Sequence, residues 1–201
     1  MNEADAWRAA ALLESAGFRP VAHARDAALL LLNTCVVRQQ AEDKIHSRLT
    51  YVAELKRENP ERTVALMGCL VGKNPRELDR FRARFPFVDL FLPPSDLAPL
   101  RTYLETRGQA VPAAAADDDL PPPPLPDSQT GRAVVAHLPV VLGCSHACTY
   151  CVIPYRRGGE RSRPSAEILA EAAALAARGV REIILLGQIV DRYGLDRPGE
   201  I

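Results

Sequence analysis

Apolar residues in the first half of the chain alternate between helical spacing and short continuous runs. Helical spacing predicts a helix over residues 5–16 and a longer helix further on. The apolar face of the longer helix carries Ile45, Leu49, Val52 and Leu55. Continuous apolar runs predict strands over residues 28–32, 63–69 and 88–92. Strands that alternate with helices in this way predict an α/β fold with a small parallel sheet.

The last third of the chain shows a second set of predicted elements. A helix begins after Arg163-Pro164-Ser165, with proline at its entrance and Gly179 just after its last turn. Its apolar positions are Ile168, Ala172, Leu175 and Ala176. Residues 182–186 are apolar enough to predict a short strand, so this region is expected to form a β-loop-α-β unit.

A segment rich in alanine, aspartate and proline separates the two sets of elements. Residues 113–127 read AAAADDDLPPPPLPD, which has no periodic apolar face and enough proline to be extended and stiff. We therefore expect two domains, residues 1–107 and residues 133–201, joined by a linker over residues 108–132.

Composition restricts the class of protein further. Lysine plus arginine and aspartate plus glutamate number 25 each, so the net charge gives no global signature of nucleic-acid binding. No apolar stretch approaches the ~20 residues needed to span a bilayer, and the amino terminus lacks a signal pattern. The odd number of cysteines, five, favours metal binding over disulfides.

Three of the five cysteines, Cys144, Cys148 and Cys151, form a C-x₃-C-x₂-C run. Structural zinc closes a tetrahedron with four protein ligands, and the nearest fourth candidate, His146, lies between the first two cysteines. A cubane iron–sulfur cluster that is bound by three thiolates keeps one iron open. The run therefore favours such a cluster, with zinc binding or three buried core cysteines as the alternatives.

Residues 142–164, which contain GCSHACTYCVIPYRRGGERSRP, resemble the cluster loop of radical S-adenosylmethionine enzymes, and specifically that of the methylthiotransferases. The resemblance implies a 4Fe-4S cluster on Cys144, Cys148 and Cys151. It also implies that the open iron binds S-adenosylmethionine, which is cleaved to a 5′-deoxyadenosyl radical. The fold implied for residues 133–201 is the opening β-α-β part of a radical SAM, TIM-like barrel.

Other positions near this loop also match the family pattern. Tyr150 matches the position that packs near the adenine of the cofactor, and an ordinary loop aromatic is the alternative. Gly187 and Gln188 resemble the loop after the second strand and are candidate cofactor-binding residues, although the family usually has asparagine where Ile189 stands. Four arginines are candidates for contacts with RNA phosphates, with a solvated loop as the alternative: Arg156, Arg157, Arg161 and Arg163.

The remaining two cysteines, Cys35 and Cys69, follow predicted strands. Their surroundings, NTCVVR and MGC, resemble the amino-terminal domain of the same family, where three cysteines bind a second 4Fe-4S cluster. Carboxyl ends of strands are where open α/β sheets place ligands, and buried free thiols are the alternative. The family's first ligand precedes the segment that Met1-Asn2-Glu3 resembles. We therefore expect a chain that is truncated there and in the barrel, and one cluster instead of two.

The motifs also indicate a substrate. NTCVVR and CTYCVIPYRRG resemble the branch that adds a methylthio group to C2 of an isopentenylated adenosine beside the tRNA anticodon. Another tRNA adenosine or a ribosomal protein is the alternative substrate, and a non-catalytic iron–sulfur or electron-transfer module is the alternative class. The implied partners are tRNA and an electron donor such as flavodoxin or ferredoxin. We expect a cytoplasmic monomer without membrane contact.

The number of thiolates predicts the iron content. Three cysteines are present for one cubane and only two for the other, so the chain should bind about four irons after anaerobic reconstitution. Cys148→Ala should remove most of this iron, and Cys69→Ala should remove little. Iron analysis of the three proteins checks the assignment, which equal losses in the two variants would contradict.

Overall fold

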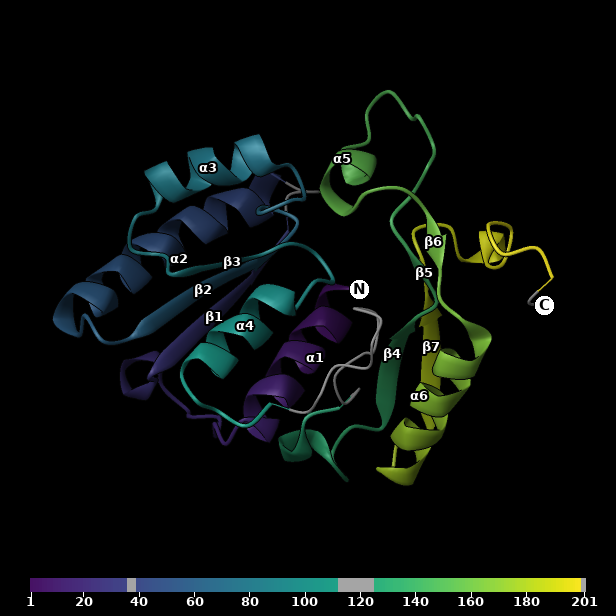
Figure 1. Cartoon of the computed structure of the whole chain (residues 1–201), viewed down its shortest axis with the longest axis horizontal. Coiled ribbons are helices and arrows are strands. Elements are labelled where there is room, and N and C mark those ends of the chain that lie inside the picture. Colours follow the sequence, from purple (N-terminus) through teal and green to yellow (C-terminus); the bar gives the residue numbers. More distant parts are fainter. Residues whose placement is uncertain (36–38, 112–124, 200–201) are drawn as a thin grey trace.

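The computed structural model describes residues 1–35, 39–111 and 125–199 (Figure 1). Its first part, residues 1–35 and 39–111, is built on a three-stranded parallel sheet in the order β1-β2-β3. The strands are β1 (Leu29–Thr34), β2 (Thr63–Gly68) and β3 (Leu90–Leu92). The predicted parallel α/β sheet is thus confirmed, although β1 extends two residues beyond the predicted end and β3 begins two residues later than predicted.

Helices cover both faces of this sheet (Figure 1). One face is covered by α2 (Gln39–Glu58) and α3 (Pro75–Arg84), and the other by α1 (Asn2–Ser15) and α4 (Ala98–Thr106). The alternation of side chains along β2 produces the two cores. Val64 and Leu66 pack with the residues of α2, whereas Ala65 and Met67 pack with those of α1 and α4.

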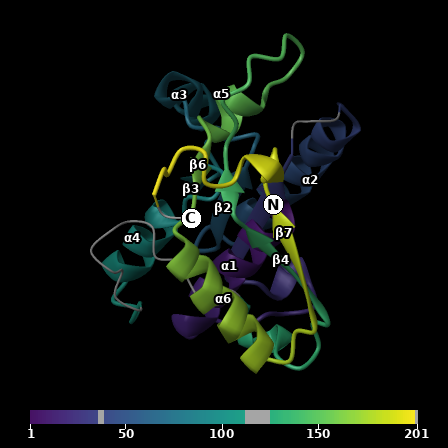
Figure 2. The same cartoon turned by 90° about the vertical axis from the view of Figure 1, so that its right-hand side faces the viewer.

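The second part, residues 125–199, contains a β-α-β unit. Strands β4 (Val135–Pro139) and β7 (Glu182–Leu186) pair in parallel and are connected through α6 (Ser165–Ala177), which lies along them (Figure 2). Within this connection, β5 (Val141–Leu142) pairs antiparallel with β6 (Arg161–Ser162), and α5 (Ile153–Arg157) lies between them in sequence. The fold predicted for this region, the opening β-α-β part of a barrel, is therefore confirmed.

Three short 3₁₀ helices complete the described elements: η1 (Ala24–Asp26), η2 (Asp127–Gln129) and η3 (Val190–Arg192). In α6, Leu175 is buried and Ile168 and Ala172 pack partly against the core, as their spacing predicts. Ala176, which belongs to the same set of apolar positions, is exposed. It is adjacent to Leu175, and one helical step of about 100° turns it away from β4.

Only the ends of the predicted linker, residues 108–132, can be described, because residues 112–124 lie outside the described part. Leu125 is 0% exposed and packs with Ala136, Leu175 and Val180. Arg178 donates from Nη1 to the carbonyl oxygen of Leu125 at 2.7 Å. The last residues of the predicted linker are therefore packed against the second part of the chain. Among the described residues, no helix is long and apolar enough to cross a membrane.

Helix α1 lies between the two parts of the molecule (Figures 1 and 2). Leu12 faces the core of the sheet, whereas Trp7 packs against the core of the second part. Arg8 Nη2 donates to both carboxylate oxygens of Glu171 in α6, at 3.0 and 2.8 Å. The same carboxylate is 2.7 Å from Nη2 of Arg163. All three charged side chains are at least nine-tenths buried, so they form a buried ion triad between α1 and the second part.

This triad predicts the effect of removing its one carboxylate. Glu171→Gln leaves the buried Arg8 without a counter-charge and leaves Arg163 with only Glu167, whose carboxylate lies 3.8 Å away. This should reduce the free energy of unfolding by about 3–5 kcal/mol. Asp79→Ala is the matched control, because Asp79 pairs with Arg82 on an exposed surface and should contribute less than about 1 kcal/mol. Urea unfolding measures both variants, and similar losses would show that the triad is not a main contact between the two parts.

Candidate functional site

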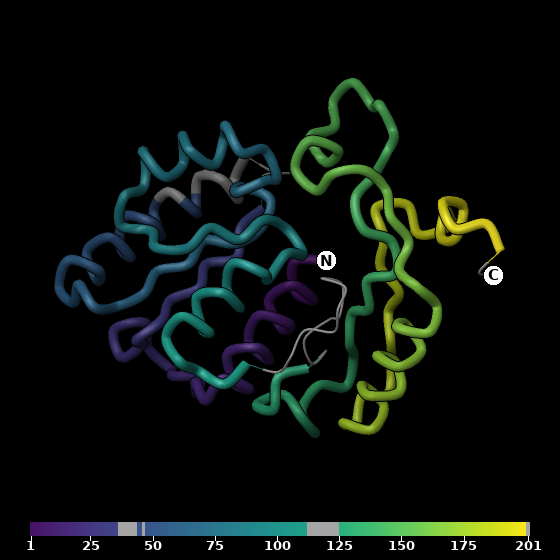
Figure 3. The backbone as a smooth tube through the Cα atoms, in the orientation of Figure 1, coloured from purple at the N-terminus to yellow at the C-terminus, as the bar shows by residue number. Residues whose placement is uncertain are grey.

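The loop with Cys144, Cys148 and Cys151 joins β5 to α5 and projects beyond both parts of the molecule (Figure 3). Its base is closed by a hydrogen bond of 3.0 Å from the Cys144 amide to the carbonyl oxygen of Gly158. Gly143 has φ +68°, and a Cβ there would collide with the carbonyl oxygens of Gly158 and Gly159. Only glycine allows the two sides of the loop to approach this closely.

The three cysteines differ in exposure: Cys144 is buried, Cys151 is intermediate and Cys148 is exposed. The Cys151 amide donates to the Cys148 carbonyl oxygen at 3.1 Å, which forms a turn between them. Cys144 Sγ lies 3.9 Å from Nδ1 of His146. Among the described residues, no three histidine, cysteine or carboxylate side chains are placed to bind one metal ion.

A cubane makes a different geometric demand from a single ion. Its three thiolates bind three different irons, so their sulfurs stand farther apart than the ligands of one ion. The cysteine loop supplies three thiolates on a closed base and no fourth protein ligand, which is the donor set of such a cluster. The residues present therefore fit a three-thiolate cluster, whereas tetrahedral zinc would need His146 and all three thiols to converge on one point.

The other two cysteines lie at the carboxyl edge of the first sheet. Cys35 directly follows β1 and Cys69 directly follows β2, and the preceding residues, Thr34 and Gly68, are register partners. The Cys69 amide donates to the carbonyl oxygen of Thr34 at 3.1 Å. The structure thus brings the two predicted cysteines together at the edge where open α/β sheets place ligands.

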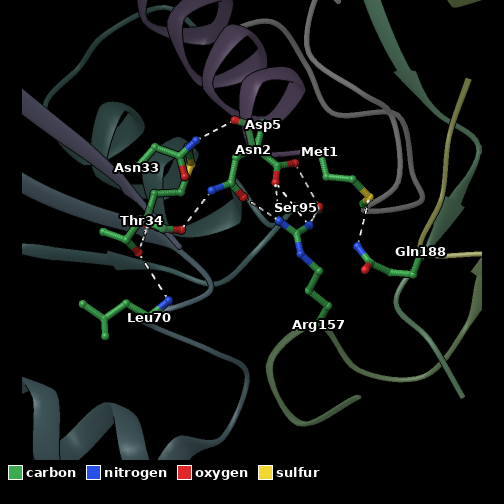
Figure 4. A network of polar contacts seen from close by, with 10 residues as sticks. Met1, Asn2, Asp5, Asn33, Thr34, Leu70, Ser95, Arg157 and Gln188 are labelled. Atoms are coloured by element: carbon green, nitrogen blue, oxygen red, sulfur yellow. Dashed lines mark hydrogen bonds and ion pairs between the residues drawn. The ribbon is translucent and has the colours of Figure 1, made fainter. Parts of the chain in front are cut away.

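Arg157 reaches this edge from α5 (Figure 4). Its Nη2 donates to Oδ1 of Asn2 at 2.8 Å, and both of its terminal nitrogens lie 3.4 Å from Oδ2 of Asp5. Ser95 donates to Oδ1 of the same Asp5 at 2.9 Å. Burial raises the pKa of the Cys69 thiol, and the positive charge of Arg157 opposes this rise.

The four predicted RNA-contact arginines do not form one exposed set. Arg157 and Arg163 are buried, and Arg163 donates from Nη1 to the carbonyl oxygen of Pro139 at 2.8 Å. Burial lowers the pKa of Arg163, and the carboxylate of Glu171 opposes this effect. Arg156 forms an ion pair with Glu77 of α3, and Arg161 is exposed on β6. The structure thus gives Arg157 and Arg163 partners inside the chain and leaves Arg161 at the surface.

The predicted cofactor residues lie on two segments. Tyr150 is 90% exposed in the cysteine loop. Gly187 and Gln188 follow β7, where Gln188 Nε2 lies 3.6 Å from Sδ of Met1. A Cβ on Gly187 would be 3.1 Å from Cβ of Val141, the residue that begins β5. The end of β7 and the base of the cysteine loop are therefore neighbours, and this close packing is itself a reason for glycine at position 187.

Sequence patterns did not identify Asn2, Asp5 and Ser95 as neighbours of a cysteine site. One signal was present, because Asp5 and Arg8 are three residues apart on a helix and therefore share a face. Both are buried beside the apolar residues of α1, and a buried charge requires a partner. Their partners come from far along the chain, so this signal could predict a contact but not its identity.

Comparisons with known proteins agree with this arrangement. Residues 1–92 match the model described as uncharacterized protein family UPF0004, and residues 138–193 match that of the radical SAM superfamily. A tRNA-2-methylthio-N(6)-dimethylallyladenosine synthase of Herpetosiphon aurantiacus is 42% identical over 99% of this chain and 43% of its own length. The enzymes of the same name in Roseiflexus sp. and Chloroflexus aurantiacus are 42% and 41% identical over 99% of the chain.

The fold and the cysteine loop thus define a radical S-adenosylmethionine protein. Because both family models and the relatives match, the chain belongs to the methylthiotransferase family of that superfamily. It spans about two fifths of the length of the curated relatives it matches.

The glycine at the base of the cysteine loop provides a test of this geometry. Gly143→Ala combines a left-handed backbone with a backbone collision, so it should destabilise the fold by roughly 2–5 kcal/mol and reduce iron binding. Gly17→Ala is the matched control, with φ +88° and no neighbour within 4 Å, and should cost about 1–2 kcal/mol without iron loss. Iron analysis and thermal unfolding distinguish them, and unchanged iron in Gly143→Ala would refute this role of the loop base.

Proposed function

We propose that this chain contributes the cluster loop and the amino-terminal domain of a tRNA methylthiotransferase. The reaction would add a methylthio group to C2 of an N6-isopentenyladenosine next to the anticodon. The observation that carries this proposal is the closed loop with Cys144, Cys148 and Cys151, in a chain that aligns over nearly its whole length with enzymes of that name. The carboxyl edge of the first sheet, with Cys35 and Cys69, supports it, because the family uses a second cysteine site.

The residues of the loop would bind a 4Fe-4S cluster through Cys144, Cys148 and Cys151. When bound, the cluster supplies one electron and an open iron for S-adenosylmethionine. The backbone closure at Gly143 and Gly158 would fix the loop, and this restricts where the cofactor can lie. Tyr150, on the exposed loop, would pack against the adenine, and Gly187 and Gln188 would line the other side.

The sheet edge would present sulfur to the substrate. Only two thiolates, Cys35 and Cys69, are available there from the described residues, so they do not by themselves form the three-thiolate set of the second family cluster. We therefore assign one cluster to the loop and a partial ligand set to the edge.

Binding of tRNA would use exposed positive charge. Arg161 on β6 and the partly exposed Arg156 are the predicted arginines that remain in reach of an external phosphate. The proposed setting is a cytoplasmic monomer that receives electrons from flavodoxin or ferredoxin. The domain limits remain as proposed from the sequence: residues 1–107, a linker over 108–132, and residues 133–201.

Cofactor cleavage tests whether the loop supports this chemistry. After anaerobic reconstitution and reduction with dithionite, the chain should convert S-adenosylmethionine to 5′-deoxyadenosine, because three thiolates leave one iron open to the cofactor. Cys148→Ala should lose this activity together with most of its iron. A cluster that is reduced but does not cleave the cofactor would instead favour the electron-transfer module.

The substrate is tested in a chimera, because the chain covers two fifths of its relatives. This chain replaces the matching segment of the Herpetosiphon relative in a host that lacks the methylthiotransferase. Mass spectrometry of the host tRNA should then detect 2-methylthio-N6-isopentenyladenosine, which the Cys148→Ala chimera should not produce. A methylthio group on a ribosomal protein instead of tRNA would assign the alternative substrate.

A further inference from the structure

Arg157 occupies the point where the cysteine loop returns to the body of the protein. Helix α5 begins two residues after Cys151, and Arg157 is its last residue. The next residue, Gly158, accepts the hydrogen bond from the amide of Cys144. The first and last cysteines of the loop are therefore connected to the Arg157 backbone through one hydrogen bond and one short helix.

The side chain of Arg157 ends beside the other cysteine site. It is 4% exposed, and its guanidinium contacts Asn2, Asp5 and Ser95 (Figure 4). Asn2 in turn donates to the carbonyl oxygen of Thr34, the last residue of β1. A guanidinium is a planar group that forms several hydrogen bonds in fixed directions, so the position of α5 and that of the sheet edge constrain each other.

The backbone after Cys69 supplies a second contact with α5. The position of a Cβ on Gly72 is 3.1 Å from Nη1 of Arg156, and that of a Cβ on Gly158 is 3.6 Å from Cδ of Lys73. The segment that follows Cys69 thus packs on α5, while the Arg157 side chain reaches Asn2, which contacts the end of β1. A displacement of α5 would move both groups, because both touch the same helix.

We propose that Arg157 is a positioning residue that couples the two cysteine sites. It transmits a displacement of the Cys144–Cys151 loop to the carboxyl edge with Cys35 and Cys69. The reason for such coupling rests on the proposed function, in which both cysteine sites act on one adenosine and the distance between the sites must be fixed. The coupling itself is a property of the metal-free chain, because every contact that carries it lies between amino-acid residues.

The test perturbs the loop and measures the sheet edge in the metal-free full chain. Two amides report the edge, because the Cys69 amide donates to the Thr34 carbonyl oxygen and the Leu70 amide donates to Thr34 Oγ1 at 3.3 Å. Their hydrogen exchange is followed by NMR in wild type, Gly143→Ala, Arg157→Met and the double variant. The Val64 amide, which donates to Asp89 at 2.7 Å at the other end of β2, is the internal reference.

Gly143→Ala should speed exchange of the two edge amides at least about threefold relative to Val64 when Arg157 is present. In the Arg157→Met background the same loop substitution should change their exchange by less than about 1.5-fold. A purely structural role would raise exchange in Arg157→Met but leave the effect of the loop substitution unchanged, and that result would overturn the proposal.

Arg62→Met is the matched control for the loss of a buried arginine. Arg62 is also buried, and its guanidinium donates to the carbonyl oxygens of Ala27, Leu55 and Arg25 within the first part of the chain. Arg62→Met should lower the free energy of unfolding and leave the coupling intact.

Two milder variants are used if the main ones fail to fold. Ser145→Ala replaces Gly143→Ala, because it removes only the 2.9 Å hydrogen bond that Ser145 accepts from the Glu160 amide. Arg157→Lys replaces Arg157→Met.

A cluster-loaded measurement separates this proposal from the proposed function. Cluster assembly on the loop should slow exchange of the Cys69 and Leu70 amides in wild type but not in Arg157→Met, with equal iron in both proteins. Absence of iron in both proteins would contradict the proposed function and leave the metal-free result to decide the coupling. Equal slowing in both loaded proteins would overturn the coupling and leave the proposed function intact.

Discussion

The arrangement of this chain depends on the burial of charged side chains on helix α1. Asp5 faces Arg157, and Arg8 faces Glu171, which also binds Arg163. A buried charge without a partner is far more costly than a buried apolar group, so these pairs restrict how the two parts can dock. The apolar contacts of α1, which include Leu12 on one side and Trp7 on the other, bury apolar surface but do not fix one orientation. The ion pairs therefore specify how the two parts dock, and the apolar contacts stabilise that arrangement.

Both cysteine sites depend on a glycine that directly precedes a cysteine. A glycine with positive φ precedes Cys69 and another precedes Cys144, and in each case a Cβ would collide with a backbone oxygen of the neighbouring segment. The Gly–Cys pair thus places a thiol where two segments come into contact. At position 68 the neighbour is the end of β1, and at position 143 it is the segment after α5. The same local solution serves an edge of a parallel sheet and the base of an exposed loop.

The arginines after Cys151 lie close together in the sequence but bind different partners in the structure. Arg157 and Arg163 point inward to carboxylates of α1 and α6, and Arg156 pairs with Glu77 of α3. A guanidinium with a buried carboxylate partner cannot serve an external phosphate without breaking that pair. Proximity in sequence to the cysteine loop suggested one RNA-facing group. Most of this positive charge instead connects the loop to the rest of the protein.

The sequence by itself determined the local elements, because hydrophobic spacing depends on neighbouring residues. It predicted the parallel strands, the long α2 face with Leu49 and Val52, and the placement of Cys35 and Cys69 at strand ends. It did not distinguish the exposed Ala176 of α6 from the buried Leu175, because small apolar residues lie on both sides of this helix. Only the tertiary structure decided which charges are internal. Asp5 and Arg157 are separated by 152 residues, and Arg8 and Glu171 by 163, so no local pattern could specify these pairs. Whether a charged side chain is solvated or buried depends on what the completed fold places against it.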